Sequence, residues 1–203
     1  GVWSSPTVDL ERRAVYVATG NGYTEPADEG SDAVIAFDID SGKRLWARQA
    51  LPGDHYVRDC PGIYRPLVPK DNKSETCPDD LGPDYDFGMS PMMRTLSDGR
   101  TIVVTGQKSG DVFAQDVRDG KLLWKATLVD KLARGEITFG GAEDDQNAYF
   151  GTRSGVIWAL DLKTGATSAT ISTGIGNSEG SIAVGAGSVW MITDAKGTLA
   201  RFD

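Results

Sequence analysis

The sequence has a single histidine, His55, and only two cysteines, Cys60 and Cys77. One histidine offers no Ser-His-Asp arrangement, and the absence of C-x-x-C and C-x-x-C-H motifs leaves no sign of a zinc site or a c-type haem. Basic residues are outnumbered by acidic ones, 21 to 29. The formal net charge is −8, which argues against nucleic-acid binding because that function needs a basic face. No apolar run approaches the length of a membrane span.

Helical periodicity is missing as well. No long stretch carries the helical apolar period of about 3.6 residues, so we expect few helices. With 203 residues, 39% of them hydrophobic, the chain can bury a core, and its 25 glycines suit many tight turns between short strands. These features favour an all-β protein.

An internal repeat organises the chain. Residues 36–46 read as a strand, a tight turn and a second strand ending in tryptophan, and residues 114–124 repeat this pattern. A third copy, at 159–166, lacks the tryptophan, and a fourth trace lies at 200–203. In each copy we expect Asp to cap the turn and Gly to supply its positive φ. The tryptophan should cover a neighbouring unit, because one hairpin cannot bury its own apolar face.

The spacing of the repeat predicts the architecture. Asp116, Asp161 and Asp203 follow one another at intervals of 45 and 42 positions, within the range of about 40–50 residues for a propeller blade. We predict a β-propeller of four-stranded antiparallel blades, about half of an eight-bladed ring. The blades should cover residues 1–50, 86–129, 137–173 and 179–203. The expected strands are 2–8, 14–19, 33–38 and 44–49; 87–96, 101–105, 111–117 and 122–128; 139–142, 147–152, 156–161 and 167–172; and 181–185, 189–193 and 198–202.

Residues 51–85 interrupt this pattern. Strand alternation disappears, six prolines occur, and an excursion of this length in a compact domain is usually functional or disordered. Cys60 and Cys77 could be free thiols, but we expect a disulfide that closes the loop, and this implies an oxidising compartment. We expect His55 to be a solvated loop residue, with a substrate contact at a cavity rim as the alternative.

The repeated unit resembles the tryptophan-docking motif of the pyrroloquinoline quinone (PQQ) dehydrogenase superfamily. Residues 1–9 followed by 15–22 resemble the segment that carries a cofactor-stacking Trp and then a calcium-binding Asn. Residues 82–88 are similar to the segment with the catalytic Asp, and 105–110 to a strand end whose Lys or Arg contacts the quinone. The order of these segments and the Cys-flanked insert look most like polyvinyl-alcohol-dehydrogenase-type quinoproteins, over about residues 1–165.

The resemblance implies a cofactor site. Trp3 would be the flat platform for the quinone, and Asn21 would give Ca²⁺ a carbonyl oxygen. Lys108 would stabilise the negative oxygen of the reduced cofactor. Taken from the residues alone, Trp3 could instead be a docking or core tryptophan, Asn21 a turn residue between two glycines, and Lys108 a solvated charge.

The resemblance also implies a general base. Asp86 would take the proton of the alcohol and would be a calcium ligand. We choose it over Asp84 because it directly precedes the aromatic-Gly pair expected to open the inner strand. Asp84, two residues away and expected on the same strand face, is the alternative base. Both could also be ordinary loop-end carboxylates of an acidic protein.

The function that the resemblance implies is PQQ- and Ca²⁺-dependent oxidation of small-molecule or polymeric alcohols. The enzyme would be periplasmic or secreted and would pass electrons to an acceptor such as a cytochrome c. The alternative is a non-catalytic binding or assembly scaffold, like the outer-membrane assembly propellers that share the docking motif. Residues 179–190 look more like streptogramin-lyase-type repeats, which leaves a lyase as a third candidate.

Two elements of the family's site have no counterpart in this sequence. They are a calcium-binding Glu from an earlier blade and a neighbouring-cysteine disulfide over the quinone. Both would lie upstream of Gly1, so their absence reflects either truncation or loss. Because Gly1 is not an initiator Met and the first residues already read as mid-strand, we expect the chain to be part of a longer protein.

Overall fold

The computed structural model describes residues 1–203 except 27, 64–65, 73–74, 130–136, 175–180 and 194–195. In this part of the chain the regular structure is β, apart from one short 3₁₀ helix, η1 (Lys70–Asn72). Within the same residues, no helix is both long and apolar enough to cross a membrane.

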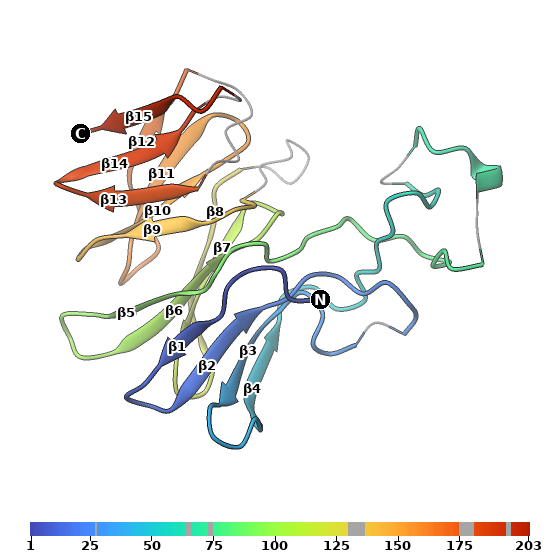
Figure 1. The fold of residues 1–203 in the computed structure, drawn as a ribbon, viewed down its shortest axis with the longest axis horizontal. Helices are drawn as coiled ribbons and strands as arrows, with labels where there is room; N and C mark the ends of the chain where they lie inside the picture. The colour runs from blue at the N-terminus through green and yellow to red at the C-terminus, as the bar shows by residue number, and fades with distance from the viewer. Residues whose placement is uncertain (27, 64–65, 73–74, 130–136, 175–180, 194–195) are drawn as a thin grey trace.

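Four antiparallel sheets succeed one another along the chain, and each runs through its strands in chain order (Figure 1). The first sheet contains β1 (Thr7–Asp9), β2 (Ala14–Ala18), β3 (Ala33–Asp38) and β4 (Arg44–Gln49). The second contains β5 (Met92–Thr95), β6 (Thr101–Gly106), β7 (Asp111–Asp116) and β8 (Leu122–Thr127). The third contains β9 (Gly141–Glu143), β10 (Asn147–Gly151), β11 (Val156–Asp161) and β12 (Thr167–Ser172). The fourth contains β13 (Ile182–Gly185), β14 (Ser188–Ile192) and β15 (Leu199–Phe202). The predicted fold class is confirmed, since these sheets form a partial β-propeller.

The first strands of the first two sheets are shorter than predicted. β1 begins at Thr7 instead of Val2, and β5 begins at Met92 instead of Phe87. The residues before each strand are irregular and bond to the chain that follows β2: the Gly20 N–H donates to the Gly1 carbonyl at 2.8 Å, and the Phe87 N–H donates to the Thr19 carbonyl at 3.1 Å. The apolar alternation was therefore misleading in these two segments, which carry site residues instead of sheet residues.

The repeated turn forms as its sequence predicts. Asp38 Oδ1 accepts hydrogen bonds from the Ser41 N–H at 2.7 Å and from the Ser41 hydroxyl at 2.6 Å. Gly42 then has a φ of +67°, in the left-handed region where a side chain is disfavoured. The Asp thus caps the turn and the Gly lets the chain reverse into β4.

The repeat tryptophans join successive sheets. The indole N–H of Trp46 donates to the Val117 carbonyl at 2.9 Å, and that of Trp124 donates to the Leu162 carbonyl at 2.9 Å. Each ring lies against the turn glycine of the next repeat, and a Cβ built on Gly120 would overlap Trp46. The predicted docking of one unit on the next is confirmed for these two junctions.

Buried apolar clusters fill the spaces between consecutive sheets. The cluster between the first two sheets includes Tyr16, Val34, Trp46, Phe87, Val103 and Phe113. The next includes Met89, Ile102, Trp124, Ile137, Phe150 and Leu160. The third includes Ile157, Ile182, Val189 and Met191. Because Phe87 and Met89 belong to these clusters, the irregular segment before β5 is fixed firmly between the sheets.

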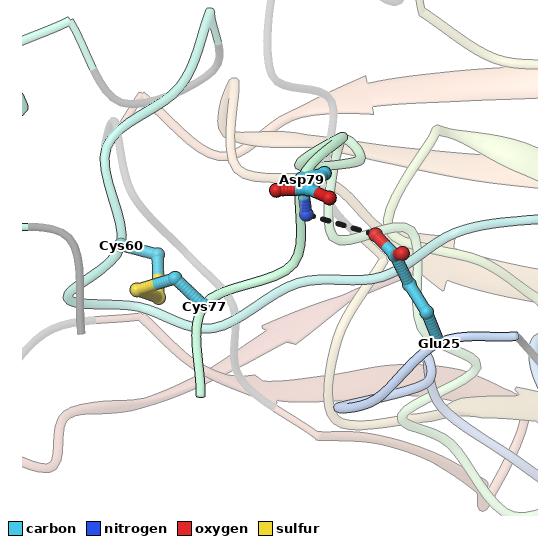
Figure 2. The surroundings of a disulfide bond; sticks show 4 residues. All are labelled: Glu25, Cys60, Cys77 and Asp79. Atoms are coloured by element: carbon cyan, nitrogen blue, oxygen red, sulfur yellow. Dashed lines mark hydrogen bonds between the residues drawn. A yellow bond between two sulfur atoms is a disulfide. The ribbon is translucent and has the colours of Figure 1, made fainter. Parts of the chain in front are cut away.

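The insert between β4 and β5 projects away from the sheets (Figure 1). Cys60 and Cys77 form the predicted disulfide within it, as Figure 2 shows. The base of this arm is tied to the β2–β3 connection, because the Asp79 N–H donates to Glu25 Oε1 at 2.8 Å. The arm is thus a closed loop attached to the first sheet.

Candidate active site

Antiparallel topology brings the predicted site residues to one end of the first two sheets. In each sheet the first strand begins where the second strand ends, because the two run in opposite directions. Trp3 precedes β1 and Asn21 follows β2, whereas Asp86 precedes β5 and Lys108 follows β6. The four residues therefore meet at the boundary between the two sheets.

Trp3 presents an indole that is 44% exposed. Its ring meets that of Phe139 edge-on, with centroids 6.1 Å apart and an interplanar angle of 77°. Gly88 allows the indole to lie against the backbone, since a Cβ there would overlap the ring. Lys108 Nζ lies 5.3 Å from the indole centroid. An accessible aromatic face beside a cation suits a flat anionic ligand such as a quinone carboxylate.

Asp86 is the centre of the polar contacts. It is buried, its Oδ1 accepts the Asn21 backbone N–H at 2.7 Å, and its Oδ2 lies 2.5 Å from Lys108 Nζ. The Lys108 backbone N–H also donates to the Asp86 carbonyl, at 3.0 Å. Gly20 makes this approach possible, because a Cβ there would overlap the Asp86 carboxylate. Asp86 thus contacts both Asn21 and Lys108 directly.

Asp84 shares the same lysine. Its Oδ1 lies 3.1 Å from Lys108 Nζ. Burial is the main cause that raises the pKa of Asp84 to about 6, with the Asp86 charge adding to it and Lys108 opposing it. Burial alone would lower the pKa of Lys108, but the hydrogen bond and charge of Asp86, with those of Asp84, raise it above its usual value. Lys108 is therefore a fixed cation between two carboxylates.

The expectation that Asp84 and Asp86 share a strand face was wrong. Both precede β5, in irregular chain, and Asp84 has a φ of +65°. They converge on Lys108 because the backbone turns between them, and strand alternation plays no part.

Asn21 is oriented by its side-chain amide. Nδ2 donates to the Gly22 carbonyl at 2.6 Å and to the Tyr56 carbonyl at 2.9 Å. Both amide protons are thus used, and Oδ1 accepts no hydrogen bond from the described residues. A carbonyl oxygen of this kind is a ligand that Ca²⁺ prefers. The donor chemistry fits a cation, but the described residues contain no cluster of three His, Cys, Asp or Glu side chains placed to hold a metal.

His55 is buried, contrary to the expectation of a solvated loop residue. It is 8% exposed and forms a parallel bridge with Gly22, and its carbonyl accepts the Gly82 N–H at 2.6 Å. Its Nε2 has no hydrogen-bond partner among the described residues. The prediction failed because the insert folds back on the β2–β3 connection, which no local pattern around His55 indicates.

Two buried carboxylates were missed by sequence reasoning. Asp32 is completely buried, and neither of its carboxylate oxygens accepts a hydrogen bond from a described residue. Asp54 is 1% exposed; its Oδ2 accepts the Tyr85 N–H at 2.9 Å, and its Oδ1 has no partner in the part of the chain that the structure describes. Burial is the largest cause that raises the pKa of Asp32, to about 8, followed by the charges of Asp54, Asp86 and Asp84. No sequence pattern distinguishes these residues from surface aspartates.

Comparison with known proteins decides the family. The family model PQQ_2, described as outer membrane protein assembly factor BamB, matches residues 79–203. This chain belongs to that family. The chain is also 41% identical over 174 residues to the polyvinylalcohol dehydrogenase of Pseudomonas sp, a match that covers 81% of the chain and 26% of that protein. It is 36% identical over 64 residues to the quinohemoprotein alcohol dehydrogenase of Comamonas testosteroni, covering 27% of the chain and 9% of that protein.

The crystal structure of BamB from Moraxella catarrhalis resembles the whole chain with a TM-score of 0.61 and 17% sequence identity, and the match covers 46% of that protein. At this identity the likeness shows the propeller fold alone. The predicted resemblance to PQQ-dependent dehydrogenase-type propellers is confirmed by the family and the dehydrogenase relatives. The chain spans about a quarter of the length of the Pseudomonas relative.

In this PQQ_2 propeller, Asp32 should make stability depend on pH. Its raised pKa means that the folded state favours the neutral acid, so its contribution to stability is complete below about pH 4 and is lost as the pH rises towards 8. We expect Asp32→Asn to flatten the decline in melting temperature between pH 5 and pH 9 by at least about 4 °C. Calorimetry on the intact protein tests this, with the exposed Asp80→Asn as control; parallel profiles for wild type and Asp32→Asn would contradict it.

Proposed function

We propose that this chain forms part of a PQQ- and Ca²⁺-dependent alcohol dehydrogenase. The observation that supports this most strongly is the contact set of Asn21, Asp86 and Lys108 beside the half-exposed Trp3. Trp3 and Lys108 have the side chains that a quinone would need, Asn21 has the oxygen that a cation would need, and Asp86 has the carboxylate that would take the proton of an alcohol. The dehydrogenase names of the relatives agree with the proposal.

Asp86 is the base in this proposal. Its carboxylate would accept the hydroxyl proton of the alcohol, and its buried position beside Lys108 holds it in one orientation for that transfer. PQQ, when bound, would supply the two-electron acceptor for the alcohol carbon. Trp3 would support its plane, and Lys108 would balance the negative charge that the reduction creates.

Asn21 and Asp86 would provide the chain's share of the calcium ligands. The free Oδ1 of Asn21 and the Asp86 carboxylate are hard oxygen donors, and the two residues are already joined through the Asn21 N–H. A cation bound there would supply electrostatic polarisation to the site. The Asn21 carboxamide donates to two backbone carbonyls, which fix its orientation.

The substrate would be a small-molecule or polymeric alcohol, and the electrons would pass to an acceptor such as a cytochrome c. We place the protein in the periplasm or outside the cell, a location supported by the Cys60–Cys77 disulfide, because such bonds persist in oxidising compartments.

A binding or assembly scaffold is the second candidate. The description of the matching family model favours it. A scaffold role gives no reason, however, for an accessible indole beside the contact between buried Asp86 and partly buried Lys108.

Dye-linked oxidation of short alcohols and of a polymeric alcohol by the intact protein tests the proposal. We expect dye reduction that requires alcohol, added PQQ and Ca²⁺ together, and that disappears when any one is omitted. The absence of alcohol-dependent dye reduction with all three present would favour the scaffold.

A further inference from the structure

Three consecutive residues at the start of the insert bond to both halves of the site. We propose that the segment Asp54–Tyr56, with the Asp54 carboxylate as its key group, is a clamp that holds Asn21 and Asp86 in position. The proposal rests on the function proposed above, and it assigns Asp54 a positioning role without contact to substrate or cofactor.

The first side of the clamp holds the Asn21 loop. The Gly22 N–H donates to the Asp54 carbonyl at 2.9 Å, and the Tyr56 N–H donates to the Gly22 carbonyl at 3.0 Å. The Tyr56 carbonyl then accepts the Asn21 side-chain amide at 2.9 Å. The clamp therefore fixes both the backbone beyond Asn21 and the direction of its carboxamide.

The second side holds the segment that carries Asp86. Asp54 Oδ2 accepts the Tyr85 N–H at 2.9 Å, and the His55 carbonyl accepts the Gly82 N–H at 2.6 Å. Gly82 allows this packing, because a Cβ there would overlap the Asp54 carboxylate. Tyr85 lies between Asp84 and Asp86, so the Asp54 carboxylate fixes the Asp84–Tyr85 peptide in the segment that carries both acids.

The two segments held by the clamp are also bonded directly to each other. Asp86 Oδ1 accepts the Asn21 N–H, so the Asn21 loop and the Asp86 segment touch each other directly and also through Asp54–Tyr56. Asp54 is 1% exposed, which makes its hydrogen bond to Tyr85 stronger than the same bond in water. The disulfide closes the arm just beyond the clamp, since Cys60 follows Tyr56 closely and Cys77 lies shortly before Gly82. The disulfide-closed arm is therefore directly connected to the clamp that supports the site.

Asp54→Ala removes the side-chain acceptor, and Asp54→Asn retains an oxygen that can accept the Tyr85 N–H. We expect Asp54→Ala to lower kcat for alcohol oxidation about 10- to 100-fold, as loss of a supporting group does, while the affinity for PQQ changes less than about threefold. Asp54→Asn should recover most of this loss. The exposed Asp80→Ala, on the same arm, is the matched control.

Hydrogen exchange in the cofactor-free intact protein gives a readout that does not depend on activity. We expect Asp54→Ala to increase exchange at residues 20–22 and at 82–86, and Gly82→Ala, which displaces the carboxylate without removing it, to do the same. Normal protection at both segments in both variants would overturn the clamp, as would a wild-type kcat in Asp54→Ala. If the wild-type protein oxidises no alcohol, the proposed function fails, and the exchange experiment still decides whether the clamp exists.

Discussion

Asp86→Asn should reduce alcohol oxidation by about 10²- to 10⁴-fold, the range that a general base contributes. Asn has nearly the shape of Asp, and its amide oxygen can still accept the Asn21 N–H that now binds Oδ1. The variant lacks a group that can take a proton at neutral pH. Its amide would also face Lys108 with a donor, but that lysine keeps Asp84 as a partner. We therefore expect a folded protein with a low kcat, measured by dye-linked assay.

Asp84→Asn is the matched control, because Asp84 contacts the same lysine from the same segment. We expect it to lose less than about tenfold in kcat. Its pKa of about 6 also predicts that any pH dependence caused by Asp84 ionisation lies near pH 6 and is absent from this variant. A large loss in Asp84→Asn with a nearly normal Asp86→Asn would transfer the role of base to Asp84.

Trp3→Ala should weaken PQQ binding by about 30- to 150-fold. The estimate corresponds to about 2–3 kcal/mol for the apolar contact of one large aromatic face. Trp3 is 44% exposed and makes none of the buried docking contacts of Trp46 and Trp124, so its removal should cost little stability. Binding is measured by titration with PQQ, followed by its absorbance.

Trp190→Ala tests whether PQQ affinity falls only when Trp3 is lost or whenever a partly buried tryptophan is removed. Trp190 is also only partly buried, but it lies in β14 of the fourth sheet, where its N–H donates to the Gly185 carbonyl. We expect unchanged PQQ affinity in that variant, and an intermediate affinity in Trp3→Phe. Equal affinity for PQQ in Trp3→Ala and wild type would remove Trp3 from the site.

Local chemistry predicted the sheets well. The short apolar run of β3, the Asp cap and the left-handed glycine of the turn are all properties of neighbouring residues, and the sequence shows them directly. The docking of Trp46 was predictable for a related reason: the same motif recurs, so a residue that cannot be buried within one copy has an obvious partner in the next.

The site was predictable only where a segment resembled a known pattern. Trp3, Asn21, Asp86 and Lys108 come from four separate segments, and the resemblance selected them before the fold brought them together. Their contacts depend on irregular chain before β1 and β5, where the strand pattern gave the wrong conformation.

The contacts made by the insert could not be predicted from the sequence. His55 and Asp54 are buried through contacts with Gly22, Gly82 and Tyr85, which lie about 30 residues away in either direction. The insert has no repeat and no alternation from which such contacts could be inferred. A buried Asp and an exposed Asp have the same sequence signature in an acidic chain.

The most direct measurement is an equilibrium titration of the intact wild-type protein with PQQ, with and without Ca²⁺. We predict saturable binding at one site, tighter in the presence of Ca²⁺, because the quinone would rest on Trp3 next to the oxygens of Asn21 and Asp86. No saturable binding at any Ca²⁺ concentration would contradict it, and would leave the Asp86–Lys108 pair as a structural contact of a non-catalytic propeller.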